Sequence, residues 1–172
     1  MFADEARFGP SREPCRCGAP QGARPTVSAQ SVREYEYAYA AVSPRDGGWD
    51  RLVLPTAHTE SMHIFLAEVA QPQAQEWIVL VRDGAGWHRA KRVCVPPNRR
   101  LVPLPPWRPP LNPVEHLGDE VREKYLANRR FVSLDQLQEQ LVAGLATLAA
   151  DAQRMASLTG FDWITCLPLT AH

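Results

Sequence analysis

The chain has 172 residues and a formal net charge of zero, with 45% hydrophobic and 22% charged residues. This length and composition are typical of one globular domain with a core of ordinary size. No apolar run reaches the roughly 18 residues of a membrane-spanning helix, and charged residues within the first five positions argue against a secretory signal. The four cysteines are too few and too scattered for a disulfide framework. We therefore expect a reducing, cytoplasmic setting and no membrane partner.

The first part of the chain predicts an antiparallel meander of three strands. Residues 1–8 form the first expected strand, which contains Asp4. Residues 32–42 alternate around three tyrosines, the period-two pattern of a second strand. A turn over residues 43–48 then leads into a third strand over residues 49–54.

A helix and two further strands are expected next. The helix has its predicted N-cap at Thr59 and an apolar stripe of helical period that runs to Val69. The unbroken apolar run of residues 77–81 predicts a strand buried on both faces, with Asp83 at its carboxyl end. Residues 100–104 predict another buried strand.

The remaining chain predicts helices. Asn112 is an expected N-cap, followed by proline at the first helical position and Glu115 at the third, and an apolar face continues to Tyr125. A longer helix with a leucine stripe should start at Ser133, where Gln136 completes a capping box.

The chain ends with shorter expected elements. A further turn or two over residues 151–158 should end at Gly160, and residues 161–164 should dock back on the body.

The order of these elements restricts the possible folds. Connection rules favour an α/β fold for this order: a ribonuclease-H-like (retroviral-integrase-like) mixed sheet flanked by helices. We expect a catalytic domain over residues 1–130, with residues 131–172 as a C-terminal helical extension packed on the same domain.

Charge is distributed unevenly along the chain. Residues 1–81 carry a net charge of −3, residues 82–130 carry +6, and residues 131–172 carry −3. The basic centre contains Arg89, Lys91, Arg92, Arg99, Arg100, Arg108, Arg122, Lys124, Arg129 and Arg130. Such clustering suits a surface that faces phosphates, although solvated faces balanced by neighbouring acids would give the same composition.

Three acids could converge on metal ions. Two-metal phosphoryl transfer needs carboxylates around a pair of hard cations, and magnesium accepts one or two carboxylates with water and substrate oxygens. Asp4 within a strand, Asp83 at the end of an adjacent strand and Glu115 in the first turn of a helix could supply them. Each also has an ordinary structural interpretation, as a surface acid, a turn residue and a helix cap, and Asp119 is a rival ligand one turn after Glu115.

Other motifs leave further interpretations open. Gly84-Ala85-Gly86 after a strand weakly suggests a dinucleotide loop, but the third glycine is replaced by Arg89. The Cys15-x-Cys17 pair has no second pair for zinc, and His58 and His63 lie five apart, which disfavours a shared metal. The prolines of residues 103–113 either fix where the Glu115 helix begins or form a polyproline ligand of an interaction protein.

Three blocks of sequence stand out together. They are Asp4-Glu5-Ala6-Arg7-Phe8-Gly9, then Asp83-Gly84-Ala85-Gly86-Trp87-His88, and finally Leu104-Pro105-Pro106 with Leu111-Asn112-Pro113-Val114-Glu115-His116-Leu117. Their combination resembles the D-D-E catalytic domain of bacterial insertion-sequence transposases of the mariner-like superfamily, over nearly the whole chain.

The resemblance implies a function and a site. It implies that Asp4, Asp83 and Glu115 are catalytic and bind two Mg²⁺ ions, which Mn²⁺ can replace. It further implies DNA cleavage at transposon ends and joining to target DNA at TA sites. The expected DNA-binding residues are His88, Arg89, Lys91, Arg92, Arg108, Arg122 and Lys124. Expected partners are DNA in the bacterial nucleoid, a separately encoded N-terminal DNA-binding half and a second copy of the chain.

Several departures from the family pattern support an alternative. We expect the chain to lack the helix-turn-helix region that family members carry before their first catalytic Asp. Gly118 also stands where a tryptophan is expected, which costs the helix roughly 1 kcal/mol relative to alanine. The chain would then be a catalytically inactive remnant, or half of a split gene, that keeps the fold and a non-specific affinity for DNA.

Overall fold

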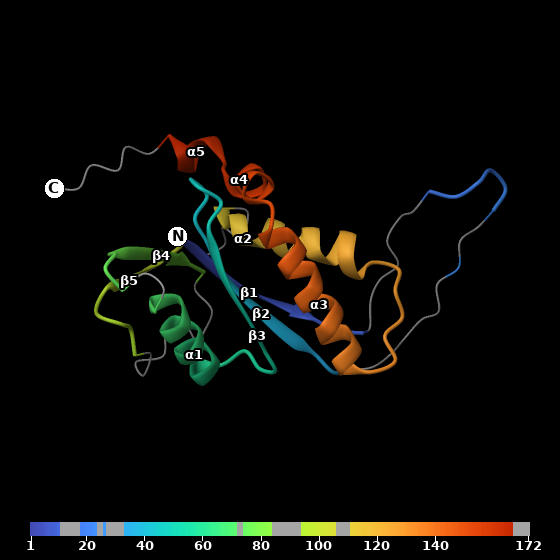
Figure 1. Cartoon of the computed structure of the whole chain (residues 1–172), viewed down its shortest axis with the longest axis horizontal. Coiled ribbons are helices and arrows are strands. Elements are labelled where there is room, and N and C mark those ends of the chain that lie inside the picture. Colours follow the sequence, from blue (N-terminus) through green and yellow to red (C-terminus); the bar gives the residue numbers. More distant parts are fainter. Residues whose placement is uncertain are drawn as a thin grey trace.

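A computed structural model describes residues 1–10, 18–23, 26, 33–71, 74–83, 94–105 and 111–166. A five-stranded sheet of order β3-β2-β1-β4-β5 lies at its centre (Figure 1). The strands are β1 (Phe2–Phe8), β2 (Glu36–Val42), β3 (Trp49–Leu54), β4 (Ile78–Arg82) and β5 (Arg99–Pro103). The helices are α1 (Thr59–Ala70), α2 (Pro113–Val121), the π-helical turn η3 (Arg122–Leu126), α3 (Leu134–Ala149), α4 (Ala152–Thr159) and α5 (Asp162–Thr165).

The sheet is mixed, as the order of elements predicts. Strands β1, β2 and β3 form the expected antiparallel meander, whereas β4 and β5 run parallel to β1. The ladder between β1 and β2 includes every residue of both strands. The ladder between β1 and β4 contains only the pairs Phe2–Val81 and Ala3–Arg82. The two central strands therefore separate after two pairs.

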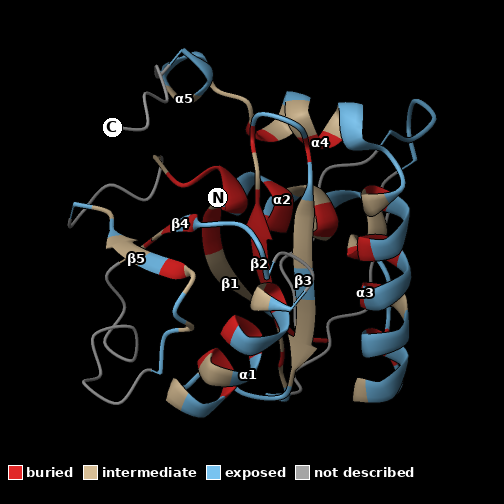
Figure 2. Cartoon of the chain, turned by 60° about the vertical axis from the view of Figure 1, so that its left-hand side comes forward, coloured by how far each residue is buried: buried red, intermediate tan, exposed pale blue. Residues whose placement is uncertain are grey.

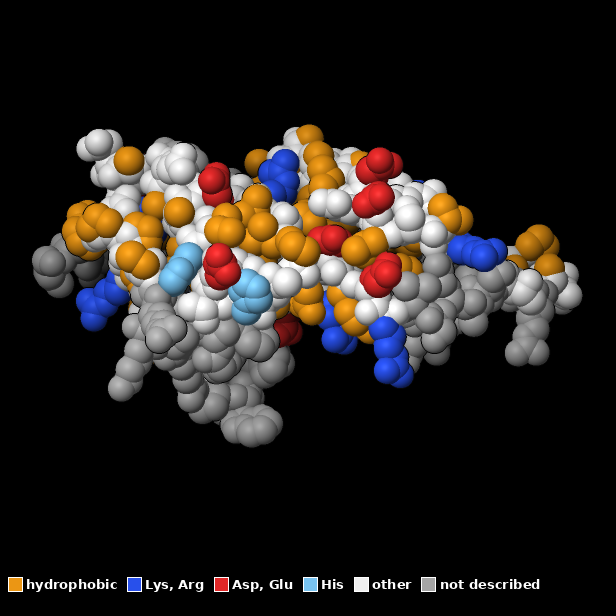
Figure 3. Space-filling model, turned by 90° about the horizontal axis from the view of Figure 1, so that it is seen from below, with side chains coloured by type: hydrophobic (Ala, Val, Ile, Leu, Met, Phe, Trp, Pro, Cys, Tyr) orange, Lys and Arg blue, Asp and Glu red, His pale blue; other side chains and the backbone are white. Residues whose placement is uncertain are grey.

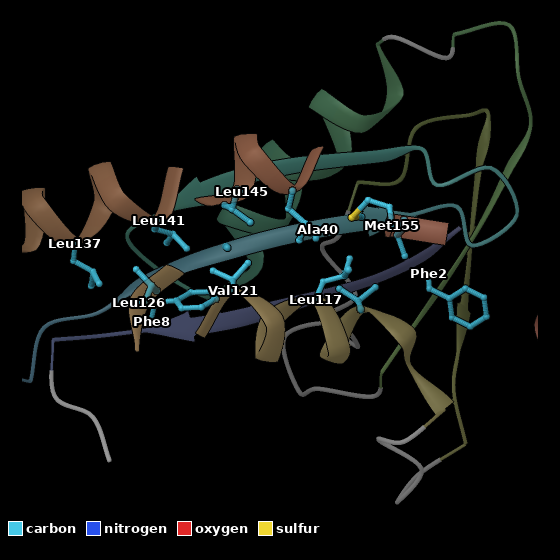
Figure 4. Close-up of a cluster of buried hydrophobic side chains, with 14 of the residues drawn as sticks. Phe2, Phe8, Ala40, Leu117, Val121, Leu126, Leu137, Leu141, Leu145 and Met155 are labelled. Atoms are coloured by element: carbon cyan, nitrogen blue, oxygen red, sulfur yellow. The ribbon is translucent and has the colours of Figure 1, made fainter. Parts of the chain in front are cut away.

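Helices cover the sheet on two faces, each with its own core. On one face α1 packs over Tyr39, Ala41 and Leu80. On the other face α2, η3, α3 and α4 bury a larger cluster, in which side chains such as Leu117 and Leu141 point toward the sheet (Figure 4). The colours of Figure 2 show that the side of α3 turned away from the sheet is exposed.

Strand β2 contributes to both cores because both of its faces are apolar. Successive side chains of a strand point to opposite faces, so Tyr39 and Ala41 enter the core under α1 while Ala40 and Val42 enter the other core. Tyr39, Ala41 and Val42 have no exposed surface. The strand expected within residues 32–42 is confirmed for Glu36–Val42, although it begins later than expected.

Helix starts follow the predicted caps in two of three cases. Asn112 caps α2 by accepting a hydrogen bond from the Val114 amide, and Ser133 caps α3 by accepting one from the Gln136 amide. The predicted N-cap of α1 is wrong, because Thr59 is already helical. His58 caps this helix instead: its backbone is extended and its side chain accepts a hydrogen bond from the Ser61 amide.

Strands β4 and β5 are less buried than their sequences suggest. Val79 is 49% exposed and Trp77, just before β4, is 80% exposed, so the prediction of a strand buried on both faces is wrong. The reason is that α1 covers only the face that carries Leu80. Strand β5 forms the edge of the sheet, where Arg100 and Pro103 are exposed as edge strands favour.

The last helices return to the body of the sheet, as expected. Helix α4 ends at Gly160, and Trp163 of α5 makes an edge-on ring contact with Phe2 at a centroid distance of 6.0 Å. His116 of α2 makes a similar contact with Phe161 at 5.0 Å. Within the described part of the chain, no helix is long and apolar enough to span a bilayer.

Candidate active site

The separation of β1 from β4 brings two acids together. Ala3 and Arg82 form the last pair of this ladder, and the next residue along each strand is Asp4 and Asp83. Both acids line the same cavity, and the charge of Asp83 raises the pKa of Asp4, so the two side chains lie near each other where the strands diverge. The end of the ladder therefore places both acids at the same cavity.

The third predicted acid approaches from the helix above. Glu115 lies in the first turn of α2, which packs on β1. The two elements approach closely at Gly118, where an added Cβ would lie 3.3 Å from the Cβ of Ala6. Asp4, Asp83 and Glu115 all line one cavity of about 370 Å³ between β1 and α2.

The Asp4 carboxylate is held by two hydrogen bonds. The backbone amide of Glu5 donates to Oδ1 at 2.9 Å, and Nδ2 of Asn112 donates to Oδ2 at 3.1 Å. Each carboxylate oxygen thus has one donor and keeps a lone pair directed elsewhere. The carboxylate is oriented before any ligand arrives.

The electrostatics of the cavity oppose the charged form of these acids. Burial, followed by the charges of Glu5 and Asp83, raises the pKa of Asp4 to about 8, while the hydrogen bond from Glu5 acts in the opposite direction. Burial, followed by Asp119 and Asp83, likewise raises the pKa of Glu115. Carboxylates that repel one another in a partly dry cavity are stabilised in their charged form by a bound cation.

The donor set fits a hard divalent cation. Three carboxylates supply only oxygen ligands, the type that Mg²⁺ and Mn²⁺ prefer. In the described ranges, no three acid, histidine or cysteine side chains lie close enough together to hold an ion as they stand. The three carboxylates line one cavity, and the charges of Asp83 and Glu115 raise the pKa of Asp4. Binding of one ion by all three would require their side chains to move closer together.

Asp119, the rival ligand, lines the same cavity but is ion-paired. It pairs with Arg122 at 2.8 Å, and its side chain is 68% exposed. The same guanidinium donates to the Arg7 carbonyl and lies 5.1 Å from the centre of the Phe8 ring. Arg122 therefore lines the cavity and makes three contacts there.

The predicted basic surface is only partly described. Lys124 pairs with Glu120, which also binds Arg154 of α4, and Lys124 does not line the cavity. Arg99 belongs to the interior: it is 4% exposed and donates to the carbonyls of Val69 and Glu76. His88, Arg89, Lys91, Arg92 and Arg108 lie outside the described residues. On the face shown in Figure 3, Lys and Arg side chains are interspersed with acidic and hydrophobic ones.

Other sequence motifs have structural roles or fall outside the described ranges. His58 caps α1, and His63 accepts a hydrogen bond from the Cys94 amide, so the two histidines do not share a ligand. The Cys15 and Cys17 pair, the glycines of residues 84–86 and the proline segment 106–110 lie outside the described residues.

Two contacts of the site were not foreseen from sequence. Asn112 is expected to cap a helix, but it also donates to Asp4, 108 positions away. Arg82 lies directly before Asp83. Burial lowers the pKa of Arg82, and the charges of Asp83 and Glu5 offset only part of this effect. The sequence does hold one signal for the contact of Asn112. A helix cap uses only the amide oxygen of asparagine, so the amide nitrogen can donate to another group.

The comparisons with known proteins agree with this geometry. Residues 1–138 match the family of DDE superfamily endonucleases. The chain belongs to this family. A relative by sequence is y4pE/y4sA, an uncharacterized protein of Sinorhizobium fredii (strain NBRC 101917 / NGR234). It is 35% identical over 130 residues, which are 75% of this chain and 96% of that protein.

Solved structures show where the fold of this DDE superfamily endonuclease recurs. The Mos1 strand transfer complex matches with a TM-score of 0.53 at 15% identity, over 93% of this chain and 54% of that chain. The Mos1 mariner paired end complex with Mn matches with a TM-score of 0.57 at 18% identity, over 93% and 55%. The chain thus spans about half the length of these proteins. The predicted ribonuclease-H-like fold and the resemblance to mariner-like D-D-E domains are confirmed.

Proposed function

We propose that this DDE superfamily endonuclease is the catalytic domain of a transposase that cleaves and joins DNA strands with the help of divalent cations. The observation that carries the proposal is the convergence of Asp4, Asp83 and Glu115 on one cavity, at the point where β1 and β4 separate. Three acids from two strands and a helix suit phosphoryl transfer better than a role in stability, because their mutual repulsion destabilises the fold.

The proposed cofactor is a pair of Mg²⁺ or Mn²⁺ ions. When bound, such ions activate an oxygen nucleophile and stabilise the departing oxygen of an in-line displacement. Asp4, Asp83 and Glu115 would hold them, and the Asn112 amide keeps the Asp4 carboxylate turned toward the cavity. A structure with a similar fold, the Mos1 mariner paired end complex, was solved with Mn, which supports the choice of metal.

The proposed substrate is DNA. The Mos1 structures with this fold are strand transfer and paired-end complexes, which supports transposon ends and target DNA as partners. Arg122 is one of two described basic residues, with Arg7, that could contact a phosphate, because both line the same cavity as the three acids. Its pairing with Asp119 is exposed and therefore weak enough to be exchanged for a phosphate contact.

A second candidate is a catalytically inactive remnant with non-specific DNA affinity. It is favoured by one observation, namely that no three ligating side chains of the described residues stand close enough to hold an ion. In this case the fold persists, but the carboxylates never assemble around metal.

A nicking assay separates the two candidates. The purified chain is incubated with supercoiled plasmid DNA and Mg²⁺ or Mn²⁺, and nicked circles are counted. Asp83→Asn should lower the rate by at least roughly 100-fold, because even residues behind a metal ligand contribute 10–100-fold. Asp162→Asn, at an exposed position of α5, is the matched control and should keep full activity. Nicking that survives Asp83→Asn contradicts the proposed site, and a folded chain that binds DNA without nicking it supports the remnant.

A further inference from the structure

Asn112 is buried at the junction of the first strand and the helix that carries Glu115. Asn112 is 1% exposed, and its side chain takes part in three hydrogen bonds. Oδ1 accepts from the Val114 amide at 3.2 Å, while Nδ2 donates to Oδ2 of Asp4 and to the carbonyl of Ala3, both at 3.1 Å. One amide group thus joins β1, the first acid and the start of α2.

The orientation of this amide follows from its partners. The Val114 group is a donor, so the atom facing it must be the amide oxygen. The Ala3 carbonyl and the Asp4 carboxylate are acceptors, so the atom facing them must be the amide nitrogen. An amide turned the other way would place like groups against each other at all three contacts.

We propose that Asn112 is a positioning residue of the metal site, which sets the affinity for divalent cations by fixing Asp4 and Glu115 relative to each other. The inference rests on the proposed function, because it assumes that these carboxylates bind metal. Asn112 does not itself touch the reacting atoms.

The contacts of the nitrogen distinguish this role from helix capping. A cap needs only an acceptor oxygen, and serine caps helices about as well as asparagine. The two hydrogen bonds from Nδ2 do not contact the free amides at the start of α2. They connect the Asp4 side chain and the Ala3 carbonyl to the start of this helix. Glu115 lies three residues further on, so a shift of this junction displaces two ligands at once.

The test replaces the amide by a hydroxyl. Asn112→Ser keeps an oxygen that can cap α2 but is too short to bridge the Val114 amide and Asp4 together. Isothermal titration of the full chain with Mn²⁺ should show binding weakened roughly 10–100-fold, the usual effect of removing a residue that orients a metal ligand. Thermal unfolding without metal should show some loss of stability, because the Ala3 carbonyl and Asp4 lose a buried donor, so affinities are compared at a temperature at which both proteins are folded.

The matched control is Asn98→Ser. Asn98 also donates from Nδ2 to two acceptors, the carbonyls of Ala74 and Glu76, both at 3.3 Å, but it does not line the cavity. This variant should bind Mn²⁺ like the wild-type chain. Asp83→Asn should bind it much more weakly than either.

The outcomes separate the inference from the function on which it rests. Equal Mn²⁺ affinity of Asn112→Ser and wild type, with loss in Asp83→Asn, overturns the role of Asn112 and leaves the metal site intact. Binding that is insensitive to Asp83→Asn overturns both.

A measurement on the wild-type chain covers the case in which Asn112→Ser does not fold. In a nuclear magnetic resonance titration with Mg²⁺, the side-chain NH₂ signals of Asn112 should shift in step with the Asp83 amide, while those of Asn98 stay in place. Signals of Asn112 that do not move while the Asp83 amide does would overturn the inference.

Discussion

At the scale of single residues, Asp4 bears most of the electrostatic cost of the site. Its side chain is enclosed between β1 and α2, and three other acids, Glu5, Asp83 and Glu115, oppose its ionisation. Only two hydrogen bonds compensate, from the Glu5 amide and Asn112. A bound cation would act in the opposite direction and favour the charged carboxylate.

The raised pKa of Asp4 makes stability depend on pH. The unfolded chain releases this proton near pH 4, whereas the folded chain keeps it up to about pH 8. The stabilisation is therefore complete below pH 4 and is lost as the pH rises toward 8, by at most about 1.4 kcal/mol per pH unit. Without divalent ions, the melting temperature should fall between pH 5 and pH 8, and Asp4→Asn should flatten this fall. Parallel curves for the two proteins, measured by circular dichroism, would contradict the account.

At the scale of elements, the turn between β2 and β3 shows how closely helices approach the sheet. Gly47 has a φ of 72°, in the left-handed region that glycine favours. An added Cβ would lie only 2.2 Å from the carbonyl oxygen of Ala152, at the start of α4. The hairpin tip and α4 therefore fit together only because this position lacks a side chain.

A matched pair of glycines tests this packing. Gly47→Ala combines the left-handed backbone cost, roughly 1–2 kcal/mol, with a clash against the backbone of α4. Gly22→Ala carries the backbone cost alone, because its φ is 85° and an added Cβ meets nothing within 4 Å. Urea unfolding should show a loss for Gly47→Ala that exceeds the loss for Gly22→Ala by at least roughly 1 kcal/mol. Equal losses of unfolding free energy in the two variants would contradict this account, because they would mean that α4 moves aside at no cost.

At the scale of the whole molecule, local patterns predicted most of the fold. The leucine stripe of α3 specifies which of its sides is buried, and connection rules then leave few ways to arrange the sheet. The exposure of Val79 could not be predicted, because an apolar run does not say whether a second layer of helices extends over both faces. The capping by His58 was missed because histidine is an uncommon N-cap.

The candidate site was predictable in its residues but not in its geometry. The spacing of Asp83 and Glu115 around a predicted strand and helix start indicates an acidic site. How Asp4 and Asp83 meet depends on where the ladder between β1 and β4 ends, which the sequence of neither strand specifies. The bond from Asn112 to Asp4 joins residues 108 positions apart, and no local pattern reports it.

The central claim is that Asp4, Asp83 and Glu115 form one divalent metal site. The most direct test is anomalous X-ray diffraction from crystals of the chain grown with Mn²⁺. The account predicts an anomalous peak in the cavity between β1 and α2, within coordinating distance of Asp4 and Asp83 and facing Glu115. Crystals that hold Mn²⁺ elsewhere on the protein while this cavity shows no peak would contradict it.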